Sequence, residues 1–120
     1  VLLVDDDEGV RRLATRVLNA AGYRVFEASS GPEAEKLFAQ YPDAIDLLVT
    51  DVVMPGCSGP ELLRRLRVHT PALPALLISG YLSAQQRAQM DASLPFVQKP
   101  FSAVEFSRRV AEALHAAAPI

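Results

Sequence analysis

Residues 46–56 read Asp46-Leu47-Leu48-Val49-Thr50-Asp51-Val52-Val53-Met54-Pro55-Gly56, an aliphatic run that ends in an acid and is followed by a turn. Strands of a parallel sheet that is buried on both faces read as continuous apolar runs rather than alternating ones. An acid at the carboxyl end of such a strand lies at the edge where α/β sheets bind ligands. Asp51 is therefore the first candidate for chemistry, although Asp is also common at helix N-caps and in loops.

Similar patterns on both sides of this run predict a regular alternation of strands and helices. Strands are predicted at residues 1–4, 23–28, 46–51, 75–80 and 94–98. Helices are predicted at residues 10–21, 30–41, 58–67, 83–91 and 103–114, the fourth from weak periodicity. The alternation predicts an α/β fold with right-handed crossovers. Five parallel strands covered on both faces favour a doubly wound, flavodoxin-like sheet with the strand order 2-1-3-4-5.

The composition is that of one globular domain over residues 1–120, with 50% hydrophobic and 22% charged residues. A net charge of −2 gives no reason to expect binding to nucleic acid or an anionic membrane. Neither a membrane span nor a signal peptide is visible. The single cysteine, Cys57, fits a reducing cytoplasm. Because the chain opens with Val1 inside an apolar run, we expect it to be an excerpt from a longer protein.

The predicted strand ends place Asp5, Asp6, Asp51, Ser79 and Lys99 at one edge of the sheet. Three adjacent carboxylates raise each other's pKa values unless a cation is bound. Mg²⁺ takes one or two carboxylates and keeps open positions for phosphate oxygens. Lys99 adds a second cation and Ser79 a hydroxyl donor, and a carboxylate can itself be the nucleophile that forms an aspartyl phosphate.

Each of these residues also has a plainer interpretation. The acids at residues 5–8 could form a solvated turn that favours the following helix dipole, the preferred interpretation for Asp7 and Glu8. Lys99 could be a surface lysine, and Ser79 could be only an N-cap. Neither Cys57 nor the histidines His69 and His115 have neighbours that suggest chemistry. Arg11, Arg12 and Arg16 lie on the polar face of the first predicted helix and are expected to be solvated, although some could meet a partner.

Taken together, the strand-end motifs resemble the receiver domain of two-component response regulators, the chemotaxis-regulator-like family, over nearly the whole chain. The matching motifs are Val1-Leu2-Leu3-Val4-Asp5-Asp6, Asp51-Val52-Val53-Met54-Pro55-Gly56-Cys57-Ser58-Gly59, Leu77-Ile78-Ser79-Gly80 and Lys99-Pro100-Phe101. The resemblance implies a signalling domain rather than an enzyme, whose own activity is limited to magnesium-dependent phosphotransfer and autodephosphorylation.

The resemblance also implies a role for each site residue. Asp51 would accept a phosphoryl group from a histidine kinase or a histidine phosphotransfer domain. Mg²⁺, or Mn²⁺ in its place, would be bound by Asp6, Asp51 and the backbone carbonyl of Val53, with Asp5 acting through water. Lys99 would pair with the phosphoryl oxygens.

A conformational switch is implied as well. Ser79 would swing toward the phosphorylated Asp51, and Phe96 would turn into the space that Ser79 leaves. The sequence departs from the family pattern at two points. Phe96 lacks the hydroxyl of a tyrosine, and the apolar Val53 stands at a position that is often polar and close to the attacking water.

Two other function classes remain open. A haloacid-dehalogenase-like phosphohydrolase would use Asp5 and Asp7 as its Asp-x-Asp motif, with Ser79 and Lys99 as further motifs. No acidic pair follows Lys99 to hold the metal, however, and Asp51 would have no role. Alternatively, the chain could be a receiver-like interaction module that is never phosphorylated.

The parent protein has several possible forms. Ser79-Gly80-Tyr81 and the alanine-rich end resemble receivers of hybrid sensor histidine kinases, so the parent could be membrane-anchored. The last predicted helix lacks the charge pattern of the winged-helix transcription-factor subgroup. No output element is visible, and a homodimer linked to phosphorylation is one possible assembly.

Overall fold

The computed structural model describes residues 1–80 and 94–117, which contain a five-stranded sheet in which every neighbouring pair of strands is parallel. The strands are β1 (Leu2–Val4), β2 (Phe26–Ala28), β3 (Leu48–Asp51), β4 (Ala75–Ser79) and β5 (Phe96–Gln98). Their order is β2-β1-β3-β4-β5, which confirms the predicted doubly wound arrangement. The helix predicted at 83–91 lies outside the described residues.

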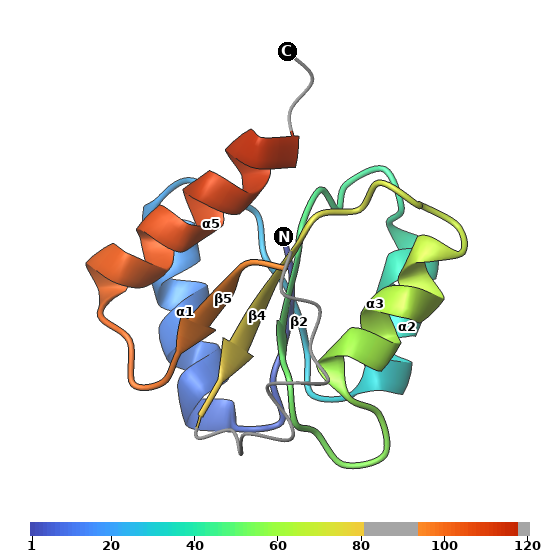
Figure 1. The fold of residues 1–120 in the computed structure, drawn as a ribbon, viewed down its shortest axis with the longest axis horizontal. Helices are drawn as coiled ribbons and strands as arrows, with labels where there is room; N and C mark the ends of the chain where they lie inside the picture. The colour runs from blue at the N-terminus through green and yellow to red at the C-terminus, as the bar shows by residue number, and fades with distance from the viewer. Residues whose placement is uncertain (81–93, 118–120) are drawn as a thin grey trace.

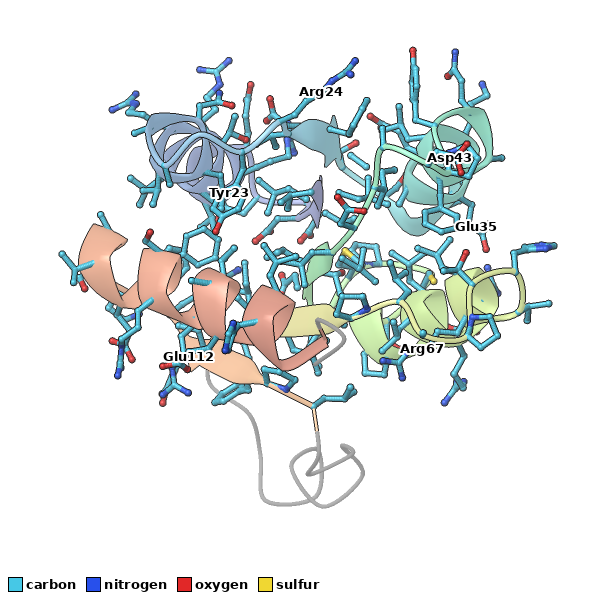
Figure 2. The ribbon with its side chains drawn as sticks, turned by 90° about the horizontal axis from the view of Figure 1, so that it is seen from above. Tyr23, Arg24, Glu35, Asp43, Arg67 and Glu112 are labelled. Atoms are coloured by element: carbon cyan, nitrogen blue, oxygen red, sulfur yellow. The ribbon has the colours of Figure 1, made fainter. Side chains whose placement is uncertain are left out.

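In the described part of the chain, helices cover both faces of the sheet (Figure 1). They are α1 (Glu8–Ala20), α2 (Gly31–Gln40), α3 (Gly59–Arg67) and α5 (Ala103–Ala117). Seen from above, α1 and α5 lie on one side and α2 and α3 on the other, with side chains filling the space between the layers (Figure 2). Leu18 and Phe106 are fully buried in the first layer and Leu62 in the second. The strands are therefore buried on both faces, which explains their continuous apolar sequences.

The second strand is shorter than predicted, because Tyr23, Arg24 and Val25 lie outside β2. Helix α1 ends in a Schellman motif, in which Tyr23 N–H donates to the carbonyl of Leu18 at 3.0 Å and Gly22 has a φ of +93°. These residues therefore complete the helix end before the ladder with β1 begins at Phe26. The fifth strand is also shorter than predicted, since its register with β4 begins at Phe96 rather than at residue 94.

Side-chain caps fix where each helix begins relative to the preceding strand. Ser30 and Ser58 accept hydrogen bonds from the backbone N–H groups of Glu33 and Glu61, which confirms both predicted helix starts. Asp7 caps α1 in the same way, and Ser102 caps α5. The loops that leave the carboxyl ends of the strands are therefore closed by local hydrogen bonds.

Gly59 packs directly against the end of β3. A Cβ atom at this position would lie 2.3 Å from the backbone oxygen of Asp51 and 3.0 Å from Cγ2 of Thr50. Its N–H donates to the carbonyl of Val52 at 2.9 Å, so the loop after Asp51 folds back onto the strand. Any larger residue would have to displace the backbone that carries Asp51.

We predict that Gly59→Ala lowers the free energy of unfolding by about 2 kcal/mol or more, because the new methyl group meets backbone that cannot move freely. Gly80→Ala is the matched control, since a Cβ there would meet no atom of the described residues within 4 Å, and its effect should stay within about 0.5 kcal/mol. Urea denaturation of both variants measures the difference. Equal free energies of unfolding for the two variants would show that the backbone around Asp51 and Gly59 moves apart at little cost, which would contradict the prediction.

Candidate functional site

Three strand ends bring a lysine and two acids into contact. Asp5 follows β1, Asp51 is the last residue of β3, and Lys99 follows β5. The Nζ atom of Lys99 lies 3.1 Å from Oδ2 of Asp5 and 3.3 Å from Oδ2 of Asp51. Figure 1 shows the arrowheads of β4 and β5 pointing to the lower edge of the sheet, which is where this cluster forms.

Asp6 completes a group of three acids whose environments differ. One carboxylate oxygen from each of Asp5, Asp6 and Asp51 lies within 4.8 Å of the other two. Asp5 is fully buried and Asp51 is nearly so, whereas Asp6 is exposed. Oδ1 of Asp5 accepts the N–H of Asp7 at 2.9 Å. Among the residues that the structure describes, Oδ2 of Asp5 has Lys99 as a charge partner but no hydrogen-bond donor in good geometry.

Burial and repulsion by a neighbouring acid together raise the pKa of Asp51. Desolvation raises the pKa of its carboxyl group most, and the negative charge of Asp5 raises it further. The positive charge and hydrogen bond of Lys99 oppose both effects but do not cancel them. The ionised form of Asp51 is therefore destabilised in the metal-free protein.

Lys99 responds in the opposite way to its surroundings. Burial by itself would lower its pKa, but the close contact with the negative charge of Asp5, followed by the charge and hydrogen bond of Asp51, outweighs this and raises it. Lys99 therefore stays protonated at neutral pH. The single positive charge of Lys99 is shared between two buried acids. With Asp6 as a third acid, this edge of the sheet carries an excess of negative charge.

Ser79 lies at the same edge, but its hydroxyl does not point to the acids in this conformation. The residue is buried, and its Oγ donates to the carbonyl of Gly80 at 3.0 Å. Its own carbonyl accepts the N–H of Lys99, which connects the ends of β4 and β5. Ser79 is therefore close in the fold to Lys99 while its hydroxyl has another partner.

Phe96 and Val53 have unequal surroundings. Phe96 is half-buried. Together with Leu94 it packs against Val52, in the loop after β3, and Leu77 on β4. The side chain of Val53, two residues after Asp51, is 56% exposed. An apolar, solvent-facing residue so close to the acid cluster gives no hydrogen-bonding group to water.

Asp7 belongs to the helix rather than to the acid group. Its Oδ1 accepts the N–H of Val10 at 3.1 Å and caps α1. This agrees with the plainer interpretation of Asp7, and it leaves the Asp5 and Asp7 pair of a haloacid-dehalogenase-like site without its second acid.

Arg11 is a residue whose place the sequence pattern missed. We expected its side chain to be solvated, but it is only 17% exposed, with Nη1 donating to the carbonyl of Asp5 at 2.8 Å. Its Nε lies 3.4 Å from Oε1 of Glu27 on β2. Helical periodicity places Arg11 on the border of the polar face, and a long side chain at a border can turn inward.

A small hollow of about 270 Å³ opens beside the acid cluster. It is lined by Val10, Leu13, Lys99, Pro100 and Phe101, so α1 and the loop after β5 form its walls. Leu13 is 46% exposed there. An apolar surface next to a charged site is suited to contact with another macromolecule.

Comparison with known proteins gives a consistent family. A family model described as "Response regulator receiver domain" matches residues 1–111. Among curated proteins, the sensor kinase CckA of Brucella abortus (strain 2308) is 40% identical over 116 residues, covering 95% of this chain. The response regulator MprA of Mycobacterium leprae (strain TN) is 37% identical over 121 residues, covering 99% of this chain. The chain spans only 12% and 52% of the lengths of these two relatives.

Solved structures agree with the sequence relatives. The crystal structure of the receiver domain from hybrid histidine kinase CckA superposes with a TM-score of 0.80 at 37% identity, covering 94% of this chain and 96% of that one. A response regulator receiver protein from Sinorhizobium medicae WSM419 gives a TM-score of 0.85 at 27% identity, covering 98% and 94%. Within the described residues, no helix has the length and apolar character that crossing a bilayer requires.

The raised pKa of Asp51 predicts that Asp51→Asn stabilises the metal-free protein at neutral pH. A carboxyl group whose pKa is raised by folding favours the native state at low pH, and that contribution is lost as the pH rises through the raised value. The gain from Asp51→Asn should therefore shrink as the pH falls toward about 4, the ordinary range of an Asp carboxyl.

Denaturation curves between neutral and acidic pH in the presence of a chelator measure this effect. Asp43→Asn, at an exposed acid in the loop before β3, is the control for a general loss of negative charge. Equal stabilisation by both substitutions at every pH would contradict the prediction.

Proposed function

This chain belongs to the response regulator receiver domain family, and we propose on that premise that Asp51 takes a phosphoryl group from a phosphohistidine of a histidine kinase or a histidine phosphotransfer domain. The carrying observation is the cluster at the strand ends. Lys99 contacts Asp51, and one carboxylate oxygen from each of Asp5, Asp6 and Asp51 lies within 4.8 Å of the other two. The phosphorylation state of Asp51 is then the signal, rather than turnover of a metabolite.

In the proposed transfer, a carboxylate oxygen of Asp51 attacks phosphorus and forms a P–O bond. The bond between phosphorus and the donor's imidazole nitrogen breaks, and its electron pair returns to the ring. Lys99 holds Oδ2 of Asp51 at 3.3 Å, which favours Oδ1 as the attacking atom.

The donor set fits a hard divalent cation, Mg²⁺ or in its place Mn²⁺. Three carboxylates converge, and Oδ2 of the buried Asp5 lacks a hydrogen-bond donor of good geometry among the described residues. Asp6, Asp51 and the backbone carbonyl of Val53 would hold the ion, with Asp5 acting through water. When bound, the ion would offset the negative charge of the acids and of the phosphoryl oxygens.

The switch is the part of the proposal that requires movement. Oγ of Ser79 now donates to the carbonyl of Gly80, so it must leave that partner to reach a phosphoryl oxygen on Asp51. Phe96 is half-buried beside Leu77 and would turn further inward as Ser79 moves. Because Phe96 has no hydroxyl, its inward state would be stabilised by packing alone.

The partner surface follows from the position of the hollow beside Lys99. A protein that presents a phosphohistidine to Asp51 would contact the apolar side chains of Val10, Leu13 and Phe101 at the same time. The same proposal includes three broader points. The parent protein is a hybrid histidine kinase, its location is cytoplasmic, and phosphorylation is linked to a homodimer. The likeness to the CckA receiver supports the first and the single free Cys57 the second, whereas the homodimer stays a prediction.

We predict that acetyl phosphate with Mg²⁺ adds one phosphoryl group to the wild type and that Asp51→Asn reduces uptake to background. Asp7→Asn is the matched control, because asparagine keeps the N-cap of α1 and the residue lies outside the acid group. Intact-mass spectrometry measures uptake, and peptide mapping locates the adduct. An adduct on Asp5 would indicate phosphohydrolase-like chemistry, and no adduct under conditions that modify another receiver would favour an interaction module that is never phosphorylated.

We also predict that Val53→Asn loses its phosphoryl group several-fold faster than the wild type. The exposed valine has no group with which to orient an attacking water, whereas an asparagine amide has both a donor and an acceptor. The decay of the phosphorylated form after removal of acetyl phosphate gives both rates, with Val68→Asn, at another exposed valine, as the control. Equal decay rates for Val53→Asn and the wild type would refute the role of this position.

A further inference from the structure

The backbone on both sides of Asp5 is tied to the end of β2. The N–H of Asp5 donates to the carbonyl of Ala28 at 3.1 Å, and its carbonyl accepts Nη1 of Arg11 at 2.8 Å. Arg11 is itself held by Glu27, whose Oε1 lies 3.4 Å from its Nε. Ala28 and Glu27 are neighbours on the same strand, so one short segment of β2 fixes both peptide units.

The hydrogen bond from Arg11 acts on the peptide unit that joins Asp5 to Asp6. Because a peptide unit is planar, holding its carbonyl oxygen also sets the direction of the Asp6 N–H and the course of the chain into Asp6. A hydrogen bond from a charged guanidinium is stronger than one between neutral groups. Asp6 is exposed, so its carboxylate depends on the backbone for its position more than the buried Asp5 does.

We propose that Arg11 is a positioning residue for the cation site, which holds the Asp5–Asp6 peptide unit so that the carboxylates of Asp5, Asp6 and Asp51 converge. This inference rests on the proposed function, because it assumes that these acids bind a divalent cation. The negative charge of Glu27 partly offsets the positive charge of the Arg11 guanidinium. Arg11 therefore orders the loop with limited repulsion of the cation.

The charge of Arg11 and its hydrogen bond have opposite effects on cation affinity. A positive charge near the site repels a divalent cation, so its removal would tighten binding if charge were the whole effect. Loss of the hydrogen bond frees the loop and weakens binding. Arg11→Lys keeps the charge, but a single ammonium cannot reproduce the fork that contacts Asp5 and Glu27 at once.

The experiment compares Mg²⁺ affinity in the wild type, Arg11→Lys and Arg12→Lys by titration calorimetry. Arg12 is the next residue on α1, and it makes only an exposed ion pair with Glu8 among the described residues, so its substitution is the matched control. We expect Arg11→Lys to weaken Mg²⁺ binding by about tenfold and Arg12→Lys to change it by less than about twofold. All titrations are made well below the melting temperature of each variant.

Two further measurements separate positioning from charge and from general stability. Arg11→Gln removes the charge, and weaker Mg²⁺ binding in this variant also supports positioning, whereas tighter binding overturns it. In the metal-free protein, the amide nitrogen of Asp6 should change its chemical shift in Arg11→Lys and not in Arg12→Lys, because it belongs to the peptide unit that Arg11 holds.

Equal Mg²⁺ affinity in Arg11→Lys and Arg12→Lys, with binding by the wild type intact, would overturn the positioning role alone. Absence of Mg²⁺ binding by the wild type would overturn the proposed function and the positioning role together. The two failures are therefore distinguishable.

Discussion

Lys99 lies between two buried carboxylates. The chemistry of the domain depends on this excess of negative over positive charge. A buried carboxylate is costly unless it is paired. Asp5 and Asp51 share one ammonium group, and Asp6 stands close to both. The pairing is sufficient to keep Lys99 protonated but not to bring the pKa of Asp51 back to its ordinary value. The site is therefore stable enough to fold and still deficient in positive charge, which is the condition that favours a cation or a ligand bound with one.

The sheet makes this arrangement possible because it fixes three chain segments that are far apart in sequence. β1 and β3 are direct neighbours, and β4 separates β3 from β5. Lys99 therefore reaches across β4 to Asp51 and across both β4 and β3 to Asp5. The close approach of Gly59 fixes the backbone of Asp51 from the other side. By contrast, the hydroxyl of Ser79 is held by one local hydrogen bond, which a phosphoryl oxygen can replace. The proposed switch uses this difference between a hydroxyl that can change partner and buried acids that stay in place.

The strand order and the edge position of Asp51 and Lys99 could be predicted because both depend on strong local signals, apolar runs that stop at charged residues. The starts of α2 and α3 could be predicted for the same reason, since Ser30 and Ser58 are favourable caps. The short β2 and the inward turn of Arg11 could not, because they depend on how a helix end meets a strand and on one side-chain rotamer. Hydrophobic periodicity gives the face of a helix, but it does not give the partner of a long polar side chain.

The difference between Asp5 and Asp6 shows the same limit. Adjacent acids look equivalent in sequence, yet one is fully buried against Lys99 and the other is exposed. Only the tertiary contacts of β1 distinguish them. The roles of Asp6 as a direct ligand and of Asp5 as one that acts through water therefore remain predictions from the family resemblance, which the burial of Asp5 against Lys99 makes physically reasonable.

In the proposed function, phosphorylation of Asp51 brings Lys99 and Ser79 into contact with the same phosphoryl group. A crystal structure of the domain with Mg²⁺ and beryllofluoride, a stable mimic of the phosphoryl group, tests it most directly. We expect the beryllium bonded to a carboxylate oxygen of Asp51, Lys99 in contact with a fluoride, and Oγ of Ser79 turned from the carbonyl of Gly80 toward the adduct. An adduct on another residue would refute Asp51 as the phosphoryl acceptor, and an adduct on Asp51 with Ser79 still bonded to Gly80 would refute the proposed switch.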